Sequence, residues 1–180
     1  MGLFDFLKKK EPTYDPANLT IHDLRAGFIF DYDLKTWIIR EEYLYDWGDH
    51  YFTREFKIDS GDDSAYLHID DNDDLFITLT KKIRIRSIDE DIPEVIKKDD
   101  KPPKKLIYNE ITFYLEGTNP GYFSNDPKSD NWAELISWDY YDTKGEFTLA
   151  IEQWGEDDFE AAFGRVIKEF EFSNILPSNQ

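Results

Sequence analysis

Apolar and polar residues alternate with a period of two along most of the chain, which is the pattern of a half-buried β-strand. In the run from 35 to 45, Trp37, Ile39, Tyr43 and Tyr45 are expected to share one face. Similar runs, rich in β-branched and aromatic residues, occupy 51–58, 65–69, 81–86, 107–115, 132–140, 147–151 and 166–172. Because such residues fit a pleated surface, we predict a mainly β protein of about ten antiparallel strands with few short helices.

The strand pattern is interrupted near the middle of the chain by the charged, Pro-containing segment KKDDKPPKK. We predict a short helix or tail at 1–18, a first β half at 19–96, a linker at 97–105, a second β half at 106–177 and a tail at 178–180. The halves are expected to be tandem meanders, barrel-like or sandwich-like, that share one core.

The two halves resemble each other in one stretch. The hairpin at Phe56–Asp70 can be laid over Trp138–Glu152 without a gap, at an offset of 138 − 56 = 82 residues. An internal duplication explains this match, and so does the general similarity of any two hairpins.

Composition excludes several classes of protein. The chain has 21 Lys+Arg against 39 Asp+Glu, which gives a net charge of −18, and it has no Cys. The charge disfavours nucleic-acid binding, because phosphates repel it. The lack of Cys excludes a disulfide scaffold, a thiolate metal site and a Cys nucleophile. The 17% of aromatic residues argues against disorder. No targeting segment is recognised, so we expect a cytoplasmic protein.

The charge is unevenly distributed. Residues 61–80 hold six Asp and no Lys or Arg, whereas residues 81–105 hold nine Lys+Arg against six acids. Lys82, Arg84 and Arg86 would lie on one face of a strand. Three interpretations are open: a surface for an anion or an acidic partner, a solvated edge strand whose cations discourage aggregation, or self-association into a homo-oligomer.

Two adjacent tyrosines, Tyr140 and Tyr141, cannot share a face of one strand, so one of them is expected to be exposed or at an interface. Together with Trp154 they are either interface anchors or core residues of a protein with modest aliphatic content. The candidate partner surface therefore comprises Tyr140, Tyr141, Trp154, Lys82, Arg84 and Arg86.

Motifs for catalysis or metal binding are weak. Asp70, Asn72 and Asp74 have the spacing that opens a calcium loop, but Leu75 replaces the turn Gly and Lys81 the closing Glu. We favour an acidic hairpin tip. The three histidines are far apart and lack metal-type spacing. We therefore assign no catalytic, cofactor-binding or metal-binding residue, and we lean towards a protein that is not an enzyme.

The N-terminal segment places Leu3, Phe4 and Leu7 on one helical face, followed by three lysines. Apolar residues beside cations suit an anionic membrane surface or a groove on a partner. The alternative is a short helix docked on its own domain, or a frayed end.

Three stretches carry a family resemblance. They are LRAGF at 24–28 with WII at 37–39, REFKI at 54–58 with YLHI at 66–69, and IEQWG at 151–155 with Glu160, Gly164 and NILP at 174–177. From about Leu19 to Pro177 the chain resembles the bacterial family catalogued as domain of unknown function 4178. The resemblance implies a bacterial source and a β-rich fold, and it implies no activity.

Three functional hypotheses follow. The first is a non-enzymatic binding or scaffolding module for an unidentified protein partner, near the membrane surface if the N-terminal segment docks there. The alternative is a β-barrel that holds a small ligand, or a weak enzyme that uses cavity carboxylates. The weakest is an acidic inhibitor that mimics nucleic acid. A pocket with converging Asp, Glu or His would support the second, a flat aromatic patch the first, and a continuous acidic face the third.

Overall fold

The computed structural model describes residues 18–126 and 131–177, and it is an antiparallel β structure with one α-helix in that part of the chain. The strands are β1 (Phe28–Tyr32), β2 (Lys35–Asp46), β3 (Phe52–Asp59), β4 (Ser64–Asp70), β5 (Phe76–Ile83), β6 (Lys105–Tyr108), β7 (Ile111–Ser124), β8 (Ala133–Asp142), β9 (Phe147–Gln153), β10 (Phe159–Ile167) and β11 (Ser173–Pro177). The helix α1 is Ile92–Asp99, and short 3₁₀ turns are η2 (Ile21–Asp23), η3 (Ile85–Ser87) and η4 (Glu169–Glu171). The predicted fold class is confirmed.

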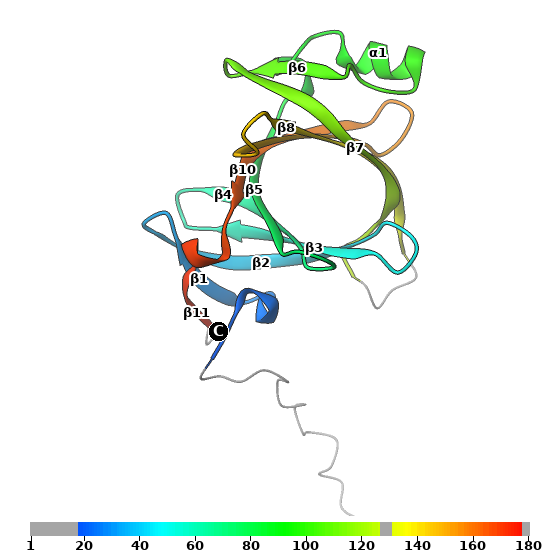
Figure 1. Cartoon of the computed structure of the whole chain (residues 1–180). Helices are drawn as coiled ribbons and strands as arrows, with labels where there is room; N and C mark the ends of the chain where they lie inside the picture. Colours follow the sequence, from blue (N-terminus) through cyan, green and yellow to red (C-terminus); the bar gives the residue numbers. More distant parts are fainter. Residues whose placement is uncertain (1–17, 127–130, 178–180) are drawn as a thin grey trace, which may run out of the picture.

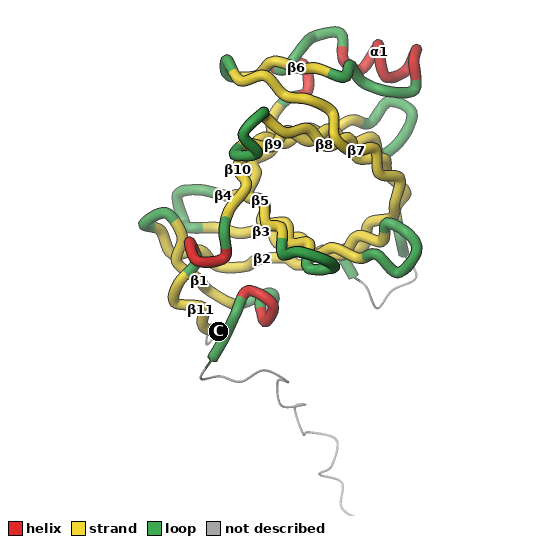
Figure 2. The backbone as a smooth tube through the Cα atoms, in the orientation of Figure 1, coloured by secondary structure: helices red, strands yellow, loops and turns green. Residues whose placement is uncertain are grey.

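The strands form one sheet that curls into a partial ring (Figures 1 and 2). The order around the ring is β2-β3-β4-β5-β10-β9-β8-β7, with β1 and β11 attached beyond β2 and β6 beyond β7. On one side β5 pairs with β10 along Ala161–Ile167. On the other side β2 pairs with β7 only at Leu44–Asp46. The ring is therefore firmly joined along one seam and narrowly joined along the other.

The two halves of the chain repeat the same hairpin. The β1–β2 turn places Asp33 and Leu34 at φ 48° and 61°, and the β6–β7 turn places Asn109 and Glu110 at φ 50° and 65°. Two consecutive positive φ angles make the tight turn whose twist matches antiparallel strands. The offset between these turns is 109 − 33 = 76 residues. This repeat supports the duplication interpretation.

A β-bulge recurs in the strand that follows each of these turns. The extra residue is Arg40 in β2 and Glu116 in β7, again 76 residues apart. A bulge reverses the face to which the following side chains point. Trp37 therefore packs in a hydrophobic core, whereas Tyr45 points into the ring. The prediction that these two aromatic residues share one face is wrong, because the extra residue shifts the alternation.

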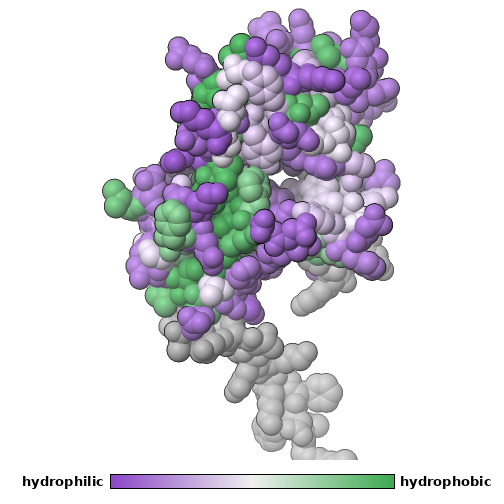
Figure 3. All heavy atoms as spheres, viewed as in Figure 1, coloured by the Kyte–Doolittle hydropathy of each residue, from purple (hydrophilic) through white to green (hydrophobic). Residues whose placement is uncertain are grey.

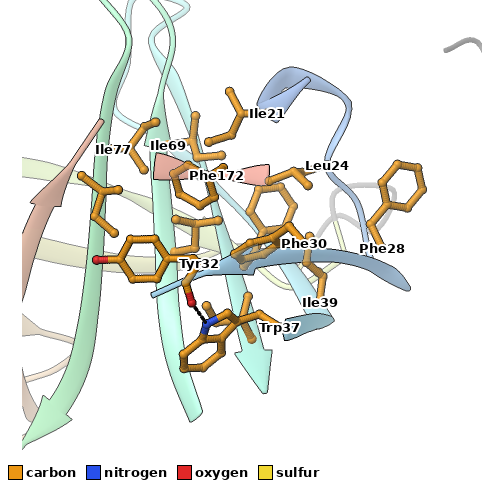
Figure 4. Packing of buried hydrophobic residues seen from close by; sticks show 14 of the residues in the cluster. Ile21, Leu24, Phe28, Phe30, Tyr32, Trp37, Ile39, Ile69, Ile77 and Phe172 are labelled. Carbon is orange, nitrogen blue, oxygen red and sulfur yellow. Dashed lines mark hydrogen bonds between the residues drawn. The ribbon is translucent and has the colours of Figure 1, made fainter. Parts of the chain in front are cut away.

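Two separate hydrophobic cores lie on the outside of the ring. The first packs β1, β11 and η2 against β2–β5, and it includes Phe30 and Phe172, whose ring centroids are 5.3 Å apart (Figure 4). In the space-filling view, hydrophobic residues gather over this lower part of the molecule (Figure 3). The second packs α1 and β6 against β7–β10 around Trp138. The expectation of one shared core is wrong in this respect, because the inner face of the ring is polar.

Helix α1 covers the second core. Ile92 and Ile96 are one turn apart and both are buried, with Pro93 in the first turn, where a missing N–H costs little. The helix ends where Asp100 adopts φ 55°. Residues 97–99 therefore form its last turn, although the sequence placed them in a linker that opposes helix.

Candidate functional site

The ring has a polar inner face, because alternate residues of each strand point outward into a core and inward into the lumen. On β4, Leu67 and Ile69 are buried in the first core, whereas Tyr66 and His68 line the lumen. Other inward-facing residues are Glu41, Tyr43, Tyr45, Thr53, Glu55, Asp70, Thr78, Thr80, Lys82, Ser137, Asp139, Tyr141, Thr148, Glu152 and Glu160. The strands therefore separate apolar packing outside from polar chemistry inside.

The lumen holds a cavity with two overlapping lobes of about 520 Å³ each. The lobes share the lining residues Tyr45, Glu55, Thr80, Ala150, Glu152 and Ala162. Ala150 and Ala162 lie opposite each other on β9 and β10, and both keep part of their surface accessible. Small side chains on this wall leave the interior unfilled. An eight-stranded ring is wide enough to hold one small ligand.

Two carboxylates lie side by side on this wall. Glu152 of β9 and Glu160 of β10 are directly opposite in the strand register, a position where like charges repel. The ammonium of Lys82 lies 2.6 Å from a carboxylate oxygen of Glu160 and balances its charge. Glu152 has no such cation. Burial, together with the nearby carboxylates of Glu55, Glu160 and Asp139, raises the pKa of Glu152 to about 8.

The other deep carboxylates have polar partners. Glu55 accepts a hydrogen bond from the hydroxyl of Tyr45 at 3.2 Å, and the Nδ1 atom of His68 lies 3.7 Å from its second oxygen. Asp139 accepts hydrogen bonds from Ser137 Oγ at 2.9 Å and Asn119 Nδ2 at 2.6 Å. Burial nevertheless raises the pKa of Asp139. The interior therefore concentrates acidic groups with few cations to balance them.

An aromatic wall lies at the narrow seam between β2 and β7. We give this name to Tyr43, Tyr45, Trp47, Phe123 and Trp154. Tyr45 and Trp47 stack at 5.3 Å, and Phe123 meets the Trp154 ring edge-on at 5.2 Å. The indole N–H of Trp154 is buried and donates to no acceptor in the described part of the protein. Flat rings beside an acidic lumen favour a ligand with an apolar or cationic part.

The predicted partner surface is divided by the structure. Tyr140 is fully buried in the second core and donates a hydrogen bond to the Pro103 carbonyl at 2.8 Å. Tyr141 points into the lumen, edge-on to Phe76 at 5.8 Å. Neither is exposed, although we expected one of them to be, because both faces of β8 are covered. Trp154 belongs to the aromatic wall, and half of the Lys82 side chain is accessible beside Glu160.

Arg84 and Arg86 do not share a strand face with Lys82. The strand β5 ends at Ile83, and both arginines belong to the turn around η3. Arg86 forms a two-pronged ion pair with Glu94 of α1, at 2.7 and 3.1 Å. The edge-strand interpretation is wrong, because β5 pairs with β4 on one side and with β10 on the other.

The remaining predicted features add no site. Asp70 accepts a hydrogen bond from the Tyr51 hydroxyl, and Asn72 donates to the Phe52 carbonyl at 2.7 Å, so this hairpin tip is internally bonded. Leu3, Phe4 and Leu7 lie outside the described residues. In the part of the chain that the structure describes, no helix is long and apolar enough to cross a membrane.

The sequence did not single out Glu55, Asp139 or Glu152, which form the acidic centre of the lumen. Each alternates with core residues, as in Trp138-Asp139-Tyr140. That pattern is the same for a polar residue that faces bulk water and for one that faces a lumen. Only the closure of the ring distinguishes the two.

The fold and cavity define a class of protein: a β ring with an acidic, aromatic-edged lumen between two outer cores. A family model described as "Domain of unknown function (DUF4178)" matches residues 25–169. The chain belongs to this family. It is also 25% identical to an uncharacterized protein of Aquifex aeolicus (strain VF5), with 98% of this chain and 99% of the relative covered. No solved structure matches.

Proposed function

We propose that the protein binds a small organic molecule inside the ring. The observation that carries this proposal is the cavity, with its two lobes of about 520 Å³ and its polar side chains beside the aromatic wall. Ligand sites are commonly concave, with apolar walls and a few placed polar groups. This supports the small-ligand hypothesis over the scaffolding hypothesis.

Cavity-filling variants provide the test. Ala162→Phe adds a phenyl group to the lumen wall, and Ala150→Leu fills the same region with a smaller side chain. Ala26→Phe is the matched control, because Ala26 lies on an exposed turn outside the lumen. Circular dichroism and melting temperature establish that each variant is folded.

Ligand-observed NMR then measures binding of a fragment panel of benzylamine, benzyl alcohol and phenylacetate to each protein. We expect at least one fragment to bind the unsubstituted protein and the Ala26→Phe variant, and to lose its signal with both folded lumen variants. Binding that is unchanged by filling the lumen, or no binding by any fragment, would refute the proposal.

A further inference from the structure

We infer that the ligand of the lumen is an organic cation, whose charged group lies among Glu55, Asp139 and Glu152 and whose apolar part lies against Tyr45 and Trp154. This inference rests on the proposed function and names the chemical class of its ligand. Three features of the lumen support it: the balance of charge, the arrangement of the carboxylates and the aromatic wall.

The balance of charge in the lumen is negative. The carboxylate of Glu41 is matched by Lys57 at 2.8 Å, and that of Glu160 by Lys82 at 2.6 Å. Within the described residues, Glu152 has neither a cation nor a hydrogen-bond donor as a partner. An unpaired buried carboxylate is costly, so it either keeps a proton or takes up an external cation. The site thus has one position at which a cationic group would complete the pairing.

The arrangement of the carboxylates favours an organic cation over a bare metal ion. Among the described residues, no three His, Asp or Glu side chains are grouped closely enough to hold one metal ion. The acidic groups instead surround the space on several strands, beside flat aromatic rings. An ammonium or amidinium group forms hydrogen bonds with separated carboxylates, and its attached carbon skeleton can pack on Tyr45 and Trp154.

Binding of such a cation is coupled to release of a proton. In the empty ring the carboxyl group of Glu152 holds its proton at neutral pH, since the pKa is about 8. The cation displaces that proton to solvent and pairs with the carboxylate left behind, so the charge in the lumen changes by no more than the exchange of one cation for another. The titratable groups that face Glu152 are Tyr45 (β2), Glu55 (β3), His68 (β4), Lys82 (β5), Asp139 (β8) and Glu160 (β10).

Isothermal titration calorimetry of the full chain with benzylamine, benzyl alcohol and phenylacetate tests the inference. These probes share one ring and differ in charge. We expect benzylamine to bind most tightly, with an affinity that rises up to about tenfold from pH 6 to pH 7, because one proton leaves for each cation bound. Repeating the titration in buffers of different ionisation enthalpy measures that proton directly.

Glu152→Gln is the diagnostic variant, because Gln keeps the size of the side chain but cannot carry the charge. We expect it to bind benzylamine at least tenfold more weakly and without proton release. Glu156→Gln, on the exposed loop after β9, is the control and should bind like the unsubstituted protein.

Two results would overturn the inference and leave the proposed function standing. One is tighter binding of benzyl alcohol or phenylacetate than of benzylamine in the lumen. The other is unchanged benzylamine affinity in the folded Glu152→Gln variant. Failure of the proposed function is distinct from both, since it appears as fragment binding that the lumen-filling variants do not affect, or as no fragment binding.

Discussion

Replacing Glu152 with Gln is predicted to stabilise the protein at neutral pH. The native pKa of Glu152 is about 8, against an ordinary value of 4.5 for the unfolded chain. Between these values the native state binds more protons than the unfolded state, so the free energy of unfolding falls as pH rises. At pH 7 the unfolded carboxyl has lost its proton over about 2.5 pH units, which at about 1.4 kcal/mol per unit corresponds to about 3 kcal/mol.

Gln stays neutral at every pH and escapes this loss. The Glu152→Gln protein should therefore be more stable by about 3 kcal/mol at pH 7 and by about 5 kcal/mol above pH 8, with little difference below pH 4.5. Carboxyls whose pKa is lowered in the fold, such as Asp23 and Asp142, lose their stabilisation only at acid pH, outside this window.

Urea denaturation at pH 5, 6, 7 and 8 measures the difference, with Glu156→Gln as the control for removal of one exposed carboxylate. Asp139 contributes in the same direction in both proteins, so the comparison of the two pH slopes isolates Glu152. Stability curves that stay parallel across this range would show that Glu152 is not a buried, protonated acid, and the reasoning would fail.

Three further changes test the fold. Leu34→Gly should raise stability by about 1 kcal/mol, because Leu34 is fully exposed at φ 61°, where only Gly is unstrained; melting temperature measures it, and an unchanged value relative to Leu34→Ala contradicts it. Gly164→Ala should destabilise by about 2 kcal/mol or more, because a Cβ would lie 1.9 Å from the Leu79 carbonyl oxygen at the β5–β10 seam; unchanged urea unfolding contradicts it. Tyr140→Phe should cost about 1 kcal/mol, because the Pro103 carbonyl loses its hydrogen bond; equal stability by urea denaturation contradicts it.

The duplicated hairpins show how far local sequence reaches. Asp33-Leu34 and Asn109-Glu110 lie between alternating runs, so each turn is encoded by its own neighbours. The helix at Pro93 is likewise local, because Pro begins it and Ile96 supplies its buried face. The bulges are not visible in the same way: Arg40 is one polar residue among several, and only the pairing of β2 with β3 identifies it as the extra one.

The acidic lumen lies beyond what strand patterns can determine. The sequence by itself determined the fold class, the spacing of the strands and the family, because alternation and turn chemistry act over a few residues. The tertiary structure decided that Glu152, Glu55 and Asp139 face one another, because β3, β8 and β9 are distant in sequence and meet only when β5 pairs with β10. Ring closure also decided the electrostatics, since it turned a polar strand face into a confined space in which burial raises the pKa of Glu152.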